Sequence, residues 1–267
     1  MIESALLGLL QGLTEWLPIS SQGVVTAASV FLFDRDAADA VALALWLHVG
    51  TSLAAVLAFR REVAGIAREI LRDPMHPSPL LAFLAVGTVV SAAVGLPLLL
   101  LLDEISGAFG AGAMALVGAL MVVTGVVQVR RPFSGTPGSG TRDRAGLSLL
   151  DAVLTGLAQG LAALPGLSRS GLTVAVLLGR RVDRSEALVL SFLLGIPAGL
   201  AAALFAGLDS GVLRTPEGLV GAAVAFVVGL ASIKVLLALA RRVNLALFVV
   251  LVGLAVIGGA VFEAVAG

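Results

Sequence analysis

The chain has 267 residues, of which 59% are hydrophobic and 13% are charged, and its mean hydropathy is +1.08. A soluble domain is about 45–50% apolar and about 25% charged, so these values exclude a soluble enzyme and a disordered chain and predict a membrane protein. The 17 Lys and Arg balance the 17 Asp and Glu, which gives no basis for a nucleic-acid partner, while zero Cys and only two His exclude disulfides, thiolate chemistry and a poly-His metal site.

Two apolar regions are interrupted by proline and small polar residues. The first region, 4–32, is interrupted at 18–23, and the second, 148–179, is interrupted at 165–171. A helix needs about 20 apolar residues to span a bilayer, so the halves of each region are too short to cross. We expect each region to be a re-entrant pair that returns to the side from which it entered. The segments that are long enough to span follow in the order 39–59, 80–102, 108–128, 186–208, 217–239 and 244–264.

The arginines mark one side of the membrane. They gather in the connections that follow the first, third and fifth spans and the second re-entrant pair, and by the positive-inside rule these four connections are cytoplasmic. For 129–147 and 180–185 both to be cytoplasmic, the segment between them must enter and leave on the same side, as a re-entrant pair does. The same scheme places both chain termini outside the cell membrane. The residues that mark the cytoplasmic side are Arg60, Arg61, Arg68, Arg72, Arg130, Arg131, Arg142, Arg144, Arg180, Arg181, Arg184, Lys234, Arg241 and Arg242.

The two halves of the chain are a repeat. Each copy begins with an interrupted region and continues with three spans, and the first copy starts outside whereas the second starts inside. The repeat is therefore inverted, which brings the two interruptions together near the middle of the membrane. We predict an all-α polytopic membrane protein with six spanning helices and two re-entrant pairs of short helices. Residues 1–267 would form a single membrane domain of two inverted repeats, about 1–131 and 146–267, joined by a cytoplasmic Arg-rich loop. The repeated residues, at an offset of 148, are Gly8, Gln11, Gly12, Leu13 and Gly23, which recur as Gly156, Gln159, Gly160, Leu161 and Gly171.

Each interrupted region carries an ionisable residue, Glu15 in the first and Arg169 in the second. Such a group at membrane depth is costly enough to indicate function. Arg169 and the free N–H groups of the helix ends would hold a phosphate or diphosphate, so we expect an anionic headgroup on an apolar tail as the ligand. Alternatively, the pair is only a structural ion pair, and the nearby hydroxyls satisfy the interrupted backbone. The polar side chains that we expect around the ligand are Thr14, Ser20, Ser21, Gln22, Ser168, Ser170 and Thr173.

The two interruptions resemble the motifs of the bacterial undecaprenyl-diphosphate phosphatases, the bacitracin-resistance proteins. That family has a first motif like E-G-x-T-E-F-L-P-x-S-S-T-G-H and a second like P-G-x-S-R-S-G, where this chain reads QGLTEWLPISSQGV at 11–24 and PGLSRSG at 165–171. SFLLGIP at 191–197 is similar to a further stretch of the family. The resemblance implies inverted repeats with two re-entrant regions. It also implies that a terminal phosphate is removed from a polyprenyl diphosphate at the outer face of the cell membrane, which recycles the lipid carrier of envelope synthesis.

The resemblance also implies roles for single residues. Glu15 matches the second family glutamate as base or metal ligand, Ser21 matches the serine proposed as nucleophile, and Arg169 matches the arginine that holds the diphosphate. Two positions depart from the family, because its first glutamate is Gln11 here and its histidine is Val24. Valine cannot activate a serine. Magnesium prefers oxygen ligands that include carboxylates, so a divalent cation, Mg²⁺ or Ca²⁺, on Glu15 and on the carbonyl oxygen of Gln11 would be held more weakly.

Two side chains have alternative interpretations. His48, in the first span, either contacts the substrate and replaces the missing base or is a hydrogen-bonded interhelical histidine; Glu15 is the other candidate for the base. Trp16 belongs either to an aromatic belt at the membrane surface or to the wall of a pocket for the lipid tail.

Two functions follow from the same site. The leading hypothesis is an integral membrane polyprenyl-diphosphate phosphatase. The alternative is a flippase of polyprenyl phosphate or a related anionic lipid, which uses the site without hydrolysis. Inverted repeats with interrupted helices are common in transporters. The departures from the family motif at Gln11 and Val24 also favour the flippase. A phosphatase should have one opening toward the outer face, whereas a carrier should open to either side. The expected partners are the membrane and the lipid, and the choice between monomer and homodimer stays open.

Overall fold

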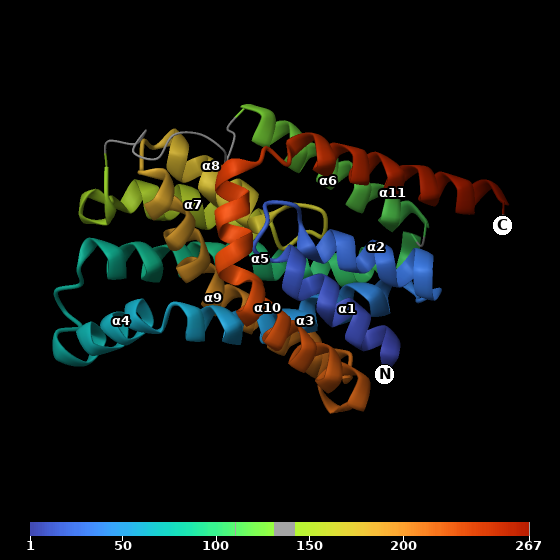
Figure 1. Ribbon diagram of the computed structural model, residues 1–267, viewed down its shortest axis with the longest axis horizontal. Helices are drawn as coiled ribbons and strands as arrows, with labels where there is room; N and C mark the ends of the chain where they lie inside the picture. The colour runs from blue at the N-terminus through green and yellow to red at the C-terminus, as the bar shows by residue number, and fades with distance from the viewer. Residues whose placement is uncertain (110, 131–141, 267) are drawn as a thin grey trace.

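The computed structural model describes residues 1–109, 111–130 and 142–266, and in this part of the chain the regular secondary structure is helical, with an isolated bridge between Arg142 and Val182. Figure 1 shows how the helices are arranged. In chain order they are α1 (Ile2–Thr14), α2 (Ser21–Phe33), α3 (Ala37–Ala58), α4 (Arg60–Arg72), α5 (Pro79–Phe109), α6 (Ala111–Arg130), the short 3₁₀ helix η1 (Arg144–Gly146), α7 (Leu149–Leu161), α8 (Arg169–Gly179), α9 (Arg184–Asp209), the short 3₁₀ helix η2 (Val212–Arg214), α10 (Pro216–Arg242) and α11 (Ala246–Ala266).

Six of these helices are long and apolar enough to cross a bilayer, which confirms the predicted all-α polytopic fold. They are α3, α5, α6, α9, α10 and α11, and each coincides with a predicted span. The largest difference is in α5, which continues to Phe109, beyond the predicted end at 102. Pro97 lies inside this helix without ending it, as is common in transmembrane helices.

The interruptions begin earlier than the proline pattern predicts. α1 ends at Thr14, so Glu15 lies within the first break, and α2 already begins at Ser21. The second break runs from 162 to 168, and α8 begins at Arg169. Both second helices start early because a serine caps them: the side chain of Ser20 accepts from the backbone N–H of Gly23, and that of Ser168 accepts from the corresponding glycine.

Equivalent helices of the two halves pack in equivalent ways. α1 lies against α10, and α7 lies against α5, while α6 and α11 lie side by side along the top edge of Figure 1. The repeated glycines make the first two contacts close: a Cβ at Gly12 would lie 2.9 Å from the backbone nitrogen of Gly229, and one at Gly156 would lie 2.7 Å from the carbonyl oxygen of Gly87. This correspondence supports the predicted inverted repeat. Most of the predicted Arg-rich linker, 131–141, lies outside the described residues.

The largest apolar core joins α3, α5, α8, α9 and α10. It is centred on Trp16, Phe83 and Phe192, and the side chains of Phe59 and Leu188 also pack there. On α3, α5 and α9 the members of this core come from the halves that border the Arg-rich connections. The other halves of these three helices remain available to surround the candidate site.

A buried carboxylate fastens the start of α7. Asp151 is fully buried and receives hydrogen bonds from Arg142, 2.7 Å away, and from Arg180, 2.6 Å away. It is also part of a capping box with Ser148, which is the N-cap residue. Burial raises the pKa of Asp151, but the hydrogen bonds from Arg142, Arg180 and Ser148 outweigh this effect and lower the pKa well below its ordinary value.

Candidate functional site

Glu15 stands at the centre of the candidate site, where the two breaks meet. Its Oε2 accepts hydrogen bonds from Ser21 Oγ at 2.6 Å and from Gln11 Nε2 at 3.0 Å, and its Oε1 accepts from the guanidinium of Arg169. The carboxylate side chain is 5% exposed. A buried carboxylate must be paired and hydrogen-bonded to remain charged, and here the second half of the chain supplies the positive partner.

Arg169 is the first residue of α8, and its guanidinium lies over Gly195 of α9. A Cβ at position 195 would lie 2.5 Å from Cζ of Arg169 and would overlap Nη1. Glycine at this position therefore leaves the space that the guanidinium occupies. The prediction that the two interruptions come together is supported by the pairing of Glu15 with Arg169.

His48 approaches the same carboxylate from α3. Its Nδ1 lies 2.9 Å from the carbonyl oxygen of Ala44, and because a carbonyl only accepts, we place the ring proton on Nδ1. Nε2, the other ring nitrogen, lies 3.4 Å from Glu15 Oε2. Val24, which replaces the histidine of the family motif, packs instead against the apolar cluster that contains Met121. His48 is therefore the imidazole that the structure offers beside Glu15 and Ser21.

Side chains of α6 hold the backbone of the breaks. Thr124 Oγ1 donates to the carbonyl oxygen of Gly166 at 3.1 Å and accepts from the N–H of Ser168 at 3.0 Å. Gln128 donates to the carbonyl oxygen of Pro18. Interrupted backbone at membrane depth needs such partners, because no bulk water satisfies it.

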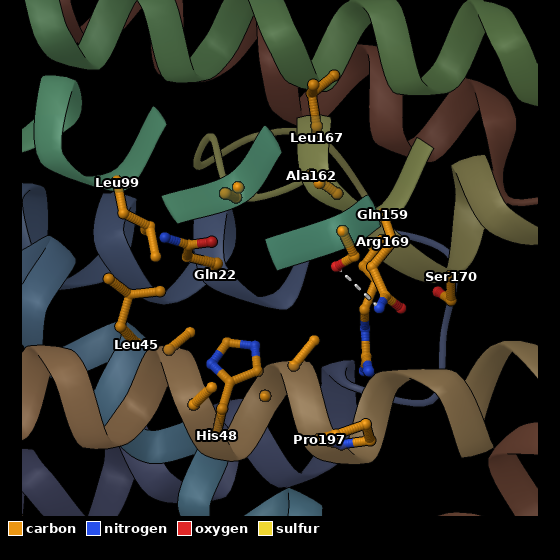
Figure 2. Close-up of a pocket in the computed structure, with 18 of the residues that line it drawn as sticks. Gln22, Leu45, His48, Leu99, Gln159, Ala162, Leu167, Arg169, Ser170 and Pro197 are labelled. Carbon is orange, nitrogen blue, oxygen red and sulfur yellow. Dashed lines mark hydrogen bonds between the residues drawn. The ribbon is translucent and has the colours of Figure 1, made fainter. Parts of the chain in front are cut away.

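A cavity of about 250 Å³ adjoins Glu15, His48 and Arg169. Figure 2 shows Gln22 beside Leu45 and Leu99 at one end of the cavity and Arg169 and Pro197 at the other, with His48 between them. Its polar lining is completed by Glu15, Ser20, Ser21, Thr88, Ser91, Gln159, Ser168 and Ser170, and its apolar lining includes Leu17, Leu96, Leu167, Pro197, Ala198, Ala201, Ala202 and Phe205.

Most of the predicted site residues line this cavity, but three do not. Gln11 lies behind Glu15 and supports it through the hydrogen bond described above. Thr14 donates to the carbonyl oxygen of Leu10 at 2.7 Å, within its own helix. Thr173 lies 2.6 Å from the hydroxyl of Ser191 and is fully buried against α9. The predicted residues that do line the cavity are Glu15, Ser20, Ser21, Gln22, His48, Ser168, Arg169 and Ser170.

Several residues near the site were not predicted. Gly195 makes room for Arg169, and the sequence offers no signal for this contact because the two residues belong to different helices. Gln159 was noted only as a repeated residue; its Nε2 donates at 3.2 Å both to Ser91 Oγ and to the carbonyl oxygen of Leu194. Trp16 does not line this cavity; it is buried against Phe192 and donates to the carbonyl oxygen of Gly229 at 3.1 Å.

The arrangement does not present a ready set of metal ligands. Both oxygens of Glu15 already accept from protein donors, and Oε1 of Gln11 is buried with no hydrogen-bond partner among the described residues. Among the described residues, no three His, Cys, Asp or Glu side chains come together as a metal site would require. Because Mg²⁺ and Ca²⁺ favour carboxylate oxygens, the expected cation site on Glu15 and Gln11 stays a prediction.

Comparisons with known proteins agree with the motifs. A model of the family described as bacitracin resistance protein BacA matches residues 4–258. An undecaprenyl-diphosphatase of Methanococcoides burtonii is 38% identical over 262 residues, which cover 94% of this chain and 95% of the relative. A relative of the same name from Haloarcula marismortui is 40% identical, and the match covers 97% of this chain and 97% of the relative. Another from Methanopyrus kandleri is also 40% identical, and the match covers 94% of this chain and 92% of the relative. The chain therefore belongs to the bacitracin resistance protein BacA family.

Proposed function

We propose that the protein is an integral membrane phosphatase that releases inorganic phosphate from a polyprenyl diphosphate of the undecaprenyl type. The observation that carries this proposal is the hydrogen bond of 2.6 Å from Ser21 to Glu15, with Arg169 on the other oxygen of the same carboxylate. The relatives from Methanococcoides burtonii, Haloarcula marismortui and Methanopyrus kandleri are named undecaprenyl-diphosphatase, which is consistent with phosphate release from a polyprenyl diphosphate. Release of phosphate would return the lipid carrier to envelope synthesis.

The cavity suits a charged headgroup on a long apolar tail. Arg169 would bind the terminal phosphate, helped by the free N–H groups at the start of α2 and α8. Gln22 lines the cavity, and its Nε2 is buried with no hydrogen-bond partner in the described parts of the chain, so it would donate to the phosphate that is attached to the lipid. The tail would lie against Leu45, Leu99 and the other apolar lining residues, because burial of apolar surface is favourable.

Ser21 is the nucleophile in this proposal. Its Oγ forms a bond to the terminal phosphorus, and the bond from phosphorus to the bridging oxygen breaks, so the lipid leaves as the monophosphate. The hydroxyl proton passes to Glu15, and His48 Nε2, which faces the same oxygen at 3.4 Å, can accept it in turn. Water then cleaves the phosphoserine, which releases inorganic phosphate and restores the Ser21 hydroxyl.

We further propose that the site opens toward the outer face of the cell membrane, where both termini would also lie. The cavity is lined by Leu45 of α3, by Leu96 and Leu99 of α5, and by Ala202 and Phe205 of α9, all of which lie in the halves remote from the Arg-rich connections. The opposite halves pack into the core around Phe192. If the arginines mark the cytoplasm, this asymmetry is the single outward opening expected of a phosphatase.

The experiment is phosphate release by the purified protein in detergent with a polyprenyl diphosphate, measured together with lipid binding. Arg169→Ala is expected to abolish both release and tight binding of the diphosphate. Arg68→Ala is a matched control, because Arg68 is exposed on α4 and, within the part of the chain that the structure describes, bonds only to the carbonyl oxygen of Ala64 in its own helix. Binding that depends on Arg169, without any release by the wild type, would refute the phosphatase and favour the flippase.

A further inference from the structure

Two serines cap the second helices of the breaks, but their backbones differ. Ser20 and Ser168 are related by the repeat offset of 148, and each accepts a hydrogen bond from the backbone N–H three residues later, at 3.3 Å and 3.1 Å. Ser168 has φ −79° and ψ 112°, which is the ordinary extended conformation of an N-cap residue. Ser20 has φ 56° and ψ 77°, in the left-handed region. The chain therefore departs from ordinary geometry at only one of two equivalent caps.

The left-handed backbone of Ser20 is unfavourable for a residue with a Cβ. It is held in place by its surroundings, since the side chain is buried and its hydroxyl also lies 3.4 Å from the carbonyl oxygen of Leu167 in the opposite break. Strained backbone that persists in a buried position is found preferentially at functional sites. The strain at Ser20 therefore needs a functional reason that does not apply to Ser168.

The difference lies in where the next residue points. After Ser168, the long side chain of Arg169 reaches across to the other break. After Ser20, the short side chain of Ser21 must turn back on its own break to bring Oγ within 2.6 Å of Glu15. Building on the phosphatase proposed above, we propose that the left-handed backbone of Ser20 is a positioning device that aims the Ser21 hydroxyl at Glu15. Ser20 is thus a positioning residue that acts through Ser21.

Glycine and alanine substitutions separate the backbone from the hydroxyl. Ser20→Gly and Ser20→Ala both remove the hydroxyl, but only glycine adopts positive φ without cost. We expect kcat for phosphate release to stay at least about tenfold higher in Ser20→Gly than in Ser20→Ala, with similar binding of the diphosphate in both. The midpoint of thermal unfolding in detergent should also be higher for Ser20→Gly. This second readout does not depend on activity.

Ser168 provides the matched control. At its ordinary backbone angles alanine is unstrained, so Ser168→Gly should be no more active and no more stable than Ser168→Ala. Equal kcat in Ser20→Gly and Ser20→Ala, in an active wild type, would overturn the positioning role while leaving the phosphatase intact. The same glycine preference at both positions would overturn it too. A wild type that releases no phosphate would instead refute the proposed function on which the role rests.

Discussion

Replacing Gly195 by alanine should displace Arg169 and leave the fold intact. A Cβ at this position would lie 2.5 Å from Cζ of Arg169, whereas carbon atoms in contact are about 3.5–4.0 Å apart. The guanidinium must therefore retreat by about 1 Å or more. Because a misplacement of about 1 Å can lower the rate of an enzyme about 100-fold, we expect kcat/KM for phosphate release to fall about 100-fold, which is about 2.7 kcal/mol of transition-state stabilisation.

The same variant should still fold but unfold at a lower temperature than the wild type. The side chain of Arg169 is 21% exposed and its far end can move, so the packing of α9 is kept, but the displaced guanidinium pairs less well with the buried carboxylate of Glu15. Gly258→Ala in α11 is the control, because a Cβ there meets no atom of the described residues within 4 Å. Wild-type kcat/KM in Gly195→Ala would refute the reasoning, since Arg169 would then not need its place over Gly195.

Four further outcomes are expected. Asp151→Asn should lower the free energy of unfolding by about 2–3 kcal/mol. Because the pKa of Asp151 in the folded state is lowered from 3.8, the stability difference between wild type and variant should be full above about pH 4 and shrink as the pH falls below it. A difference that grows in acid would contradict the lowered pKa of Asp151. His48→Gln should lower kcat about 100-fold with binding retained, because no imidazole then takes the proton from Glu15; an unchanged kcat would remove His48 from the mechanism. Thr124→Val should lower stability by about 1–3 kcal/mol by freeing two backbone groups, and Thr124→Ser should restore it; no loss in the valine variant would show that these bonds are dispensable. With EDTA, diphosphate binding that depends on Arg169 should persist, whereas its loss would show that a cation holds the headgroup.

Much of the architecture could be predicted because the bilayer imposes simple rules. Six spans follow from hydropathy and length, and the two breaks follow from proline and small polar residues in segments that are otherwise apolar. The repeat offset and the arginine distribution then predict that the breaks meet, which the pairing of Glu15 with Arg169 supports. These inferences rest on properties that a single sequence carries along its length.

The details of the site could not be predicted, because they depend on contacts between distant segments. Proline positions suggested breaks that start at Pro18, whereas the structure begins the break at Glu15 and restarts the helix at Ser21, where a serine cap outweighs the breaker signal. Thr14 has the residue type of a ligand contact but bonds within its own helix. Trp16 has the residue type of a membrane belt but fills the core instead.

His48 illustrates how one type of side chain can reach the same place from a different helix. The histidine of the family motif would stand on α2, where this chain has Val24, and the imidazole beside Glu15 comes from α3 instead. Chemistry requires an acceptor near the carboxylate and does not require a particular helix to supply it. The sequence allowed this replacement as one of two alternatives, and the distance of 3.4 Å between Nε2 and Oε2 favours it.

The most direct test of the central claim is the release of inorganic phosphate from a polyprenyl diphosphate with a labelled terminal phosphate, compared between the wild type and Ser21→Ala. The wild type is predicted to release labelled phosphate and polyprenyl monophosphate in equal amounts. Ser21→Ala is predicted to bind the lipid and release none, because it lacks the hydroxyl that Glu15 accepts at 2.6 Å. Release by Ser21→Ala at the wild-type rate would contradict the account, since phosphorus would then be attacked by another group.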